Sequence, residues 1–73
     1  EKNISEAIEY LRRAVALEYD RVDWRFTLAR ALAETGQTED AIHEARICLR
    51  LNSQFKAAER LIADLSVRDG TGE

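Results

Sequence analysis

Apolar residues recur at spacings of three and four along most of the chain, which is the period of an amphipathic helix. The stretch 22–51 shows this pattern twice, on either side of a polar turn at Thr35-Gly36-Gln37. The apolar stripe before the turn is Trp24, Leu28, Ala31 and Leu32, and the stripe after it is Ala41, Ile42, Ala45, Cys48, Leu49 and Leu51. Gly36 is expected to end the first helix, because glycine tolerates the left-handed conformation of a C-cap. The stretch therefore predicts two antiparallel helices joined by a tight turn.

Two further segments carry the same periodicity, one on each side of this pair. The apolar positions are Ile4, Ala7, Ile8, Leu11, Ala14, Val15 and Leu17 in the first segment, and Phe55, Ala58, Leu61, Ile62 and Leu65 in the last. Asn3, Asp20 and either Asn52 or Ser53 are expected to cap the starts of helices, since their side chains accept from free backbone N–H groups. The segment 68–73 is polar and rich in glycine, so we expect a flexible tail. The sequence thus predicts an all-α fold of about four helices.

Composition limits the size and the class of the protein. The chain has 73 residues, three glycines, no proline and a net charge of −3 with both signs interspersed. A domain of this length is marginally stable alone, and the absence of a block of like charge disfavours nucleic-acid and membrane surfaces. The single cysteine, Cys48, excludes an intramolecular disulfide and fits a reducing compartment, so cytoplasmic localisation is expected. No apolar run approaches the roughly 20 residues that span a bilayer.

The sequence also contains an internal repeat. A shift of 34 residues aligns small residues with small ones and large aliphatics with large ones. The shift places Ala7 on Ala41, Ile8 on Ile42, Ala14 on Cys48, Leu17 on Leu51, Leu28 on Ile62 and Ala29 on Ala63. A period near 34 that contains two helices is typical of stacked helical hairpins.

Here the chain resembles the tetratricopeptide repeat (TPR) family, whose pattern is W-x2-L-G-x2-Y, then A-x3-F, then P. The corresponding residues are Arg25-x2-Leu28-Ala29-x2-Leu32, then Ala41-x3-Ala45, then Ser53. Leu28 and Ala41 match literally, while the aromatic residue is displaced by one position to Trp24 and the proline is absent. The resemblance implies a TPR-like α-solenoid fragment of stacked antiparallel hairpins over residues 1–67. In it, 3–19 is the second helix of a repeat, 20–52 a complete repeat and 53–67 a C-terminal capping helix. A four-helix bundle with one closed core is the structural alternative.

Residues suited to catalysis are scarce. His43 is expected on the outer side of its helix, and Cys48 on the apolar face, where it acts as a small buried hydrophobe. No Cys/His cluster has metal-ligand spacing, and no glycine-rich phosphate loop is present. We therefore expect no enzymatic activity, no cofactor and no metal.

The resemblance implies instead that a peptide or a helix of a partner protein binds in a concave groove lined by the first helix of each hairpin. The groove residues in this register are Asp23, Phe26, Thr27, Arg30, Glu34, Arg60 and Asp64, with Ala57 beside them. Phe26 lies off the apolar stripe, and with Arg30 and Arg60 it would hold an apolar side chain beside an acidic group. Some TPRs hold a C-terminal carboxylate with Lys and Asn where this chain has Phe26 and Arg30, so chaperone-tail binding is not expected. Alternatively, Phe26 packs on a neighbouring helix and the arginines are solvated.

Two other functions fit the same sequence. The first is homo-oligomerisation through an apolar edge of the first helix, at Ile4, Ile8, Leu11 and Val15. The second is a regulatory appendage of an enzyme encoded N-terminal to this segment.

Overall fold

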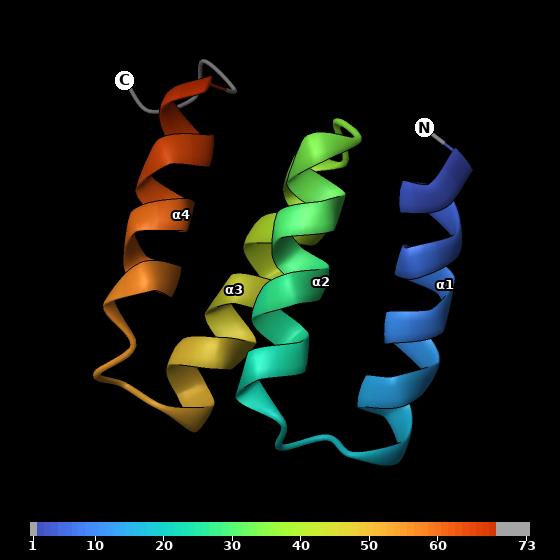
Figure 1. The fold of residues 1–73 in the computed structure, drawn as a ribbon. Coiled ribbons are helices and arrows are strands. Elements are labelled where there is room, and N and C mark those ends of the chain that lie inside the picture. The colour runs from blue at the N-terminus through green and yellow to red at the C-terminus, as the bar shows by residue number, and fades with distance from the viewer. Residues whose placement is uncertain (1, 69–73) are drawn as a thin grey trace.

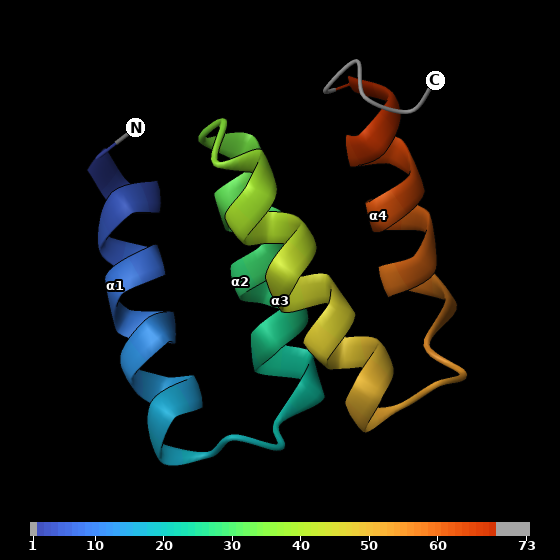
Figure 2. The ribbon, with the colours of Figure 1, turned by 180° about the vertical axis from the view of Figure 1, so that it is seen from behind.

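The computed structural model describes residues 2–68, which form four α-helices and no strand. They are α1 (Lys2–Leu17), α2 (Val22–Glu34), α3 (Thr38–Leu51) and α4 (Lys56–Arg68). Figure 1 shows α1 and α4 on opposite sides of a central pair, in which α2 lies in front of α3. The view from behind shows the same order with α3 in front (Figure 2). The all-α prediction is confirmed.

The helices form an open stack. α2 contacts each of the other three helices, whereas the backbone of α1 approaches only that of α2. The molecule extends 36 × 30 × 14 Å, so it is thin in one direction. A four-helix bundle would bring all its helices around one core. The structure therefore has the hairpin stacking of a solenoid, and the bundle alternative is wrong.

The turn between α2 and α3 has the geometry expected from its glycine. Gly36 has φ of 83°, the left-handed conformation. The N–H of Gln37 donates to the carbonyl of Leu32 at 2.9 Å, and the N–H of Gly36 donates to the carbonyl of Ala33 at 3.2 Å. These two bonds form a Schellman motif, which satisfies carbonyl groups at the end of a helix. Gly36 therefore ends α2 as predicted.

The predicted helix starts are less accurate. Asp20 does not cap α2, because the N-cap position is Arg21 and no side chain caps it. Instead, the Asp23 carboxylate accepts the N–H of Trp24 at 3.0 Å. Asn3 lies inside α1, which already begins at Lys2.

The C-terminal helix also differs from the prediction. The side chain of Asn52 accepts the N–H of Gln54 at 3.1 Å, which holds residues 52–54 in a turn and delays α4 until Lys56. Of the predicted tail 68–73, Arg68 still belongs to α4. Residues 69–73 lie outside the described part.

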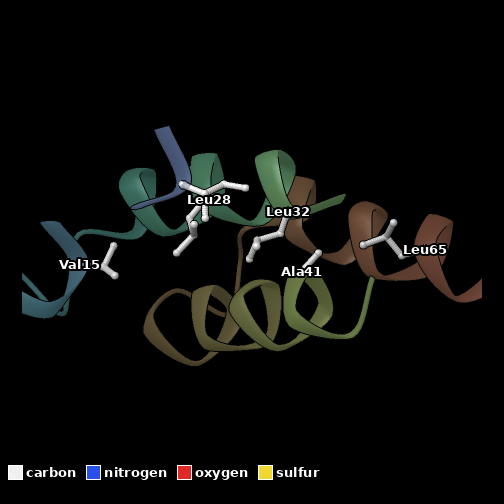
Figure 3. Close-up of a cluster of buried hydrophobic side chains, with 6 residues drawn as sticks. Val15, Leu28, Leu32, Ala41 and Leu65 are labelled. Carbon is white, nitrogen blue, oxygen red and sulfur yellow. The ribbon is translucent and has the colours of Figure 1, made fainter. Parts of the chain in front are cut away.

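Small residues fill the interface between α2 and α3. A row of buried apolar side chains runs from Val15 of α1 across Leu28 and Leu32 of α2 and Ala41 of α3 to Leu65 of α4 (Figure 3). α1 and α4, at the two ends of this row, have no backbone contact with each other. A second cluster contains Ala29, Ala45, Cys48 and Ala58, all with no exposed surface. Because alanine and cysteine project little from the helix, the two backbones of the full repeat approach closely.

Replacing Ala41 with leucine tests this packing. Ala41 has no exposed surface, so the added atoms force the helices apart, at a cost of about 1–3 kcal/mol. For a domain of this size each kcal/mol lowers Tm by roughly 4–8 °C. Thermal unfolding followed by circular dichroism measures the change. Ala16→Leu is the matched control, because Ala16 is exposed on α1, and it should leave Tm nearly unchanged. An unaltered Tm in Ala41→Leu would show that position 41 is not part of the tightly packed core.

Candidate partner-binding groove

An open groove of about 780 Å³ lies between α2 and α4. Phe26 and Arg30 of α2 form one side, and α4 forms the other side with residues that include Lys56, Ala57, Arg60, Asp64 and Val67. Four of the seven predicted groove residues thus lie together: Phe26, Arg30, Arg60 and Asp64. They come from the first helices of two consecutive hairpins, which lie next to each other because α3 packs against both.

The other three predicted residues are placed differently. Glu34 lines a smaller hollow of about 340 Å³, which shares Arg30 and Asp64 with the groove. Asp23 and Thr27 are exposed on α2 but line neither hollow. Thr27 Oγ1 donates to the carbonyl of Asp23 at 3.0 Å. The Asp23 carboxylate accepts from Arg21 at 3.3 Å, and this hydrogen bond lowers its pKa.

Phe26 both packs within the chain and lines the groove. Its ring lies 5.1 Å from the ring of Phe55, with an interplanar angle of 64°. This edge-to-face geometry is favourable for aromatic pairs. Phe55 precedes α4 in the chain, so the contact joins α2 to the segment that leads into α4. Packing of Phe26 within the chain and a role of Phe26 in the groove are therefore compatible.

The groove has a charge opposite to that of the whole chain. Three cations line it, Arg30, Lys56 and Arg60, against one carboxylate, Asp64, which gives a local formal charge of +2. The whole chain carries −3. All three cationic residues are exposed. An acidic ligand is therefore favoured at this place on an otherwise acidic protein.

A buried ion pair between α2 and α3 was not predicted from the sequence. Arg25 Nη1 lies 2.7 Å from Glu44 Oε1, and the two side chains are only 7% and 13% exposed. Arg25 Nε also donates to the carbonyl of Tyr19 at 3.0 Å, and the guanidinium lies 4.4 Å from the centre of the Tyr19 ring. Arg25 thus ties the loop before α2 to both helices of the repeat.

The sequence did contain a signal for this pair. Arg25 precedes Leu28 by three residues and Leu32 by seven, so it belongs to the buried face of α2. It also aligns with the tryptophan of the family pattern. A charged residue in such a position requires a partner, because burying an unpaired charge is costly.

Cys48 and His43 lie where the sequence predicted. Cys48 has no exposed surface, and its Sγ lies 3.7 Å from the carbonyl oxygen of Val22. Burial, with a smaller contribution from the nearby Glu44 carboxylate, raises the pKa of this thiol to about 11. His43 is exposed on α3. Within residues 2–68, no group of three or more His, Cys, Asp and Glu side chains is arranged to hold a metal ion. None of the described helices is both long and apolar enough to cross a bilayer.

The residues expected to form an apolar edge on α1 face inward. Ile8 and Val15 are 7% and 5% exposed, and Ile4 and Leu11 pack partly against the same cluster. This happens because α1 turns this face toward α2. The exposed large apolar residues of α1 are Tyr10 and Leu17. The exposed apolar surface of α1 is therefore formed by Tyr10 and Leu17 and not by the four expected residues.

The Arg25–Glu44 pair predicts an asymmetric response to substitution. Arg25→Leu leaves Glu44 buried without its partner and should lower the free energy of unfolding by about 3 kcal/mol, as should Glu44→Leu. The double variant should lie within about 1 kcal/mol of the wild type, because a buried pair is often replaceable by apolar groups. Urea unfolding measures all three. Arg12→Leu is the control, since Arg12 forms a surface pair with Asp40 at 3.8 Å. Additive losses in the double variant would contradict this account of the pair.

The Cys48 thiol should be nearly unreactive in the folded protein. Its pKa of about 11, against an ordinary 9.0, reduces the thiolate fraction at pH 8 by about a hundredfold. Raising the pH from 9 toward 11 should also destabilise the fold, because the unfolded chain ionises this thiol before the folded chain does. Modification by a chromogenic disulfide, with and without denaturant, measures the reactivity. A rapid reaction of the folded protein at pH 8 would contradict the burial.

Comparison with known proteins agrees with this architecture. The family profile described as Tetratricopeptide repeat matches residues 1–65. Over 71 residues the chain is 31% identical to the TPR repeat-containing thioredoxin TTL4 of Arabidopsis thaliana. That match covers 97% of this chain but only 10% of the relative's length. No solved structure gives a significant match. From the helix pairing, the period and the profile match, the chain belongs to the tetratricopeptide repeat family.

Proposed function

We propose that the chain is a protein–protein interaction module that holds a segment of a partner protein in the groove between α2 and α4. TPR domains are generally protein–protein interaction modules. The observation that carries the proposal is an apolar hollow, bordered by cations, on the surface shared by the first helices of two hairpins. Protein interfaces typically have an apolar core and a polar rim. The hollow provides the first and the cations around it provide the second.

The lining of the groove supports one kind of ligand. Phe26 and Val67 offer apolar surface, and Val67 is 73% exposed. Arg30, Arg60 and Lys56 border this surface, and arginine is suited to bidentate binding of carboxylates. The preferred ligand is therefore a peptide segment with a large apolar side chain flanked by carboxylates.

The rigidity of the groove also supports binding. Both walls are helices, and the Phe26–Phe55 contact fixes the aromatic ring that faces the ligand. A preformed site loses less conformational entropy when it binds than a mobile loop does. In this proposal the chain acts by binding alone, and neither the exposed His43 nor the buried Cys48 takes part in chemistry.

The size of the relative supports a second proposal. The chain spans about a tenth of a protein whose name combines TPR repeats with thioredoxin. A regulatory appendage of a larger enzyme would use the same groove, with the enzyme or its substrate as the partner. The two proposals differ only in whether the partner is part of the same polypeptide.

The proposed binding can be measured with two labelled peptides. One has a central leucine flanked by glutamates, and the other has lysines in place of the glutamates. Fluorescence anisotropy should show binding of the acidic peptide and much weaker binding of the basic one. Arg60→Glu should weaken binding of the acidic peptide about tenfold, which corresponds to the loss of one close charge contact. Arg30→Glu should act in the same direction.

Arg46→Glu is the matched control, because Arg46 is exposed on α3 and does not line the groove. It makes the same change of charge and should leave the affinity within about twofold, allowing for long-range screening at physiological salt. Equal losses for Arg46→Glu and Arg60→Glu would show that net charge alone governs binding, and would contradict the groove.

A further inference from the structure

The groove and the smaller hollow beside it form one continuous channel along α2 and α4. They share three lining residues, which include Arg30 and Asp64. The charged residues that they do not share differ in sign, because the groove adds Lys56 and Arg60 whereas the smaller hollow adds Glu34. With Arg30 and Asp64 counted in both, the formal charge is +2 in the groove and −1 in the smaller hollow. The charge of the channel therefore changes sign along its length.

This change of sign follows the direction of the helices. Figure 1 shows α2 and α4 running in the same direction, with their N-terminal ends toward the bottom of the view. Lys56 is the first residue of α4, and Glu34 is the last residue of α2. Arg60 lies about one turn after Lys56. The cationic end of the channel is thus near the N-terminal end of α4, and its acidic end is at the C-terminal end of α2.

The charges at the two ends do not stabilise the helices that carry them. A helix dipole disfavours a cation at the N-terminal end and an anion at the C-terminal end, which are the places of Lys56 and Glu34. Lys56 and Arg60 are also like charges four residues apart, which destabilises a helix. Within the described residues, neither Lys56 nor Glu34 is in an ion pair. Departures from local rules are expected at functional sites, so these charges are suited to a ligand.

We infer that the channel selects a dipolar segment, with carboxylates on one side of the apolar residue and a basic residue on the other. The carboxylates lie at Lys56 and Arg60, the apolar side chain at Phe26 and the basic side chain at Glu34. This inference rests on the proposed function, and it specifies the two flanks of the apolar residue separately.

The spacing along α2 sets the spacing in the ligand. Phe26 and Glu34 are eight residues apart, which is about 12 Å along a helix. An extended chain covers that length with about four residues. The basic residue of the ligand is therefore about four positions from its apolar residue.

The charges of the channel also determine the orientation of the ligand. In the reverse orientation a basic residue would meet Lys56 and Arg60, and a carboxylate would meet Glu34. Like charges brought together at an interface suppress that arrangement. The acidic end of the ligand therefore lies at the N-terminal end of α4, whichever direction the peptide chain runs.

Two labelled peptides of equal length test the selection. One has glutamates on both sides of a central leucine, and in the other a lysine four positions from the leucine replaces the glutamates of one side. Fluorescence anisotropy should show about threefold tighter binding of the second peptide, because repulsion at Glu34 becomes attraction. Glu34→Lys should reverse this preference. It should also preserve the fold, since a cation is favoured at a helix C-terminal end.

Glu9→Lys is the matched control, because Glu9 is exposed on α1 and lines neither hollow. It makes the same change of charge and should leave the preference for the dipolar peptide intact. Equal affinity of the two peptides for the wild type, or a preference that Glu34→Lys does not reverse, would overturn the inference while the groove still binds. Failure of both peptides to bind would overturn the proposed function as well.

A nitroxide spin label on the dipolar peptide tests the orientation. A label at the acidic end should broaden the amide NMR signals of Lys56 and Ala57, and a label at the basic end should broaden those of Ala33 and Glu34. A second dipolar peptide, with the residue order reversed, should again place its acidic end at Lys56. Broadening at the same place by the N-terminal label of both peptides would contradict an orientation set by charge.

Discussion

The close packing of α2 on α3 is the constraint on which the rest of the structure depends. It requires small side chains at the contact, and Ala29, Ala41, Ala45 and Cys48 all lie there without exposed surface. α2 also contacts α1 and α4. The orientation of α2 about its own axis therefore determines which of its side chains face those two helices. The same orientation turns Phe26 and Arg30 toward α4, where they form one side of the groove.

The Arg25–Glu44 pair specifies the register in which α2 packs on α3. Alanines allow two helices to approach closely but specify their register weakly, whereas a buried ion pair at 2.7 Å is satisfied in only one register. The pair must compensate for a large desolvation cost, so its contribution is better understood as specificity than as stability. The two members of the pair act in opposite directions on the pKa of Cys48, which Glu44 raises and Arg25 lowers, and burial is the largest cause of the raised value.

The periodic features of the fold could be predicted from the sequence, and the local ones could not. The repeat and the turn at Gly36 follow from residue size and from backbone conformation, which depend little on distant contacts. Asp20 failed as a cap because Asp, Asn and Ser accept hydrogen bonds in many local geometries, and here Asp23 was used instead. The expected edge on α1 was misplaced because periodicity identifies an apolar face without saying which neighbour covers it. Four groove residues were predicted together because they follow from the register of the repeat, whereas Asp23 and Thr27 do not line the groove.

A solenoid surface binds partners where consecutive first helices come together, and this chain provides one such place, with apolar and cationic lining. We propose that this groove is the binding surface. An amide NMR titration of the folded chain with the leucine–glutamate peptide tests it most directly. We expect the largest chemical-shift changes at Phe26, Arg30, Arg60 and Val67, with little change on the outer side of α3 around His43. Changes centred on α1 or on that outer side of α3 would contradict it.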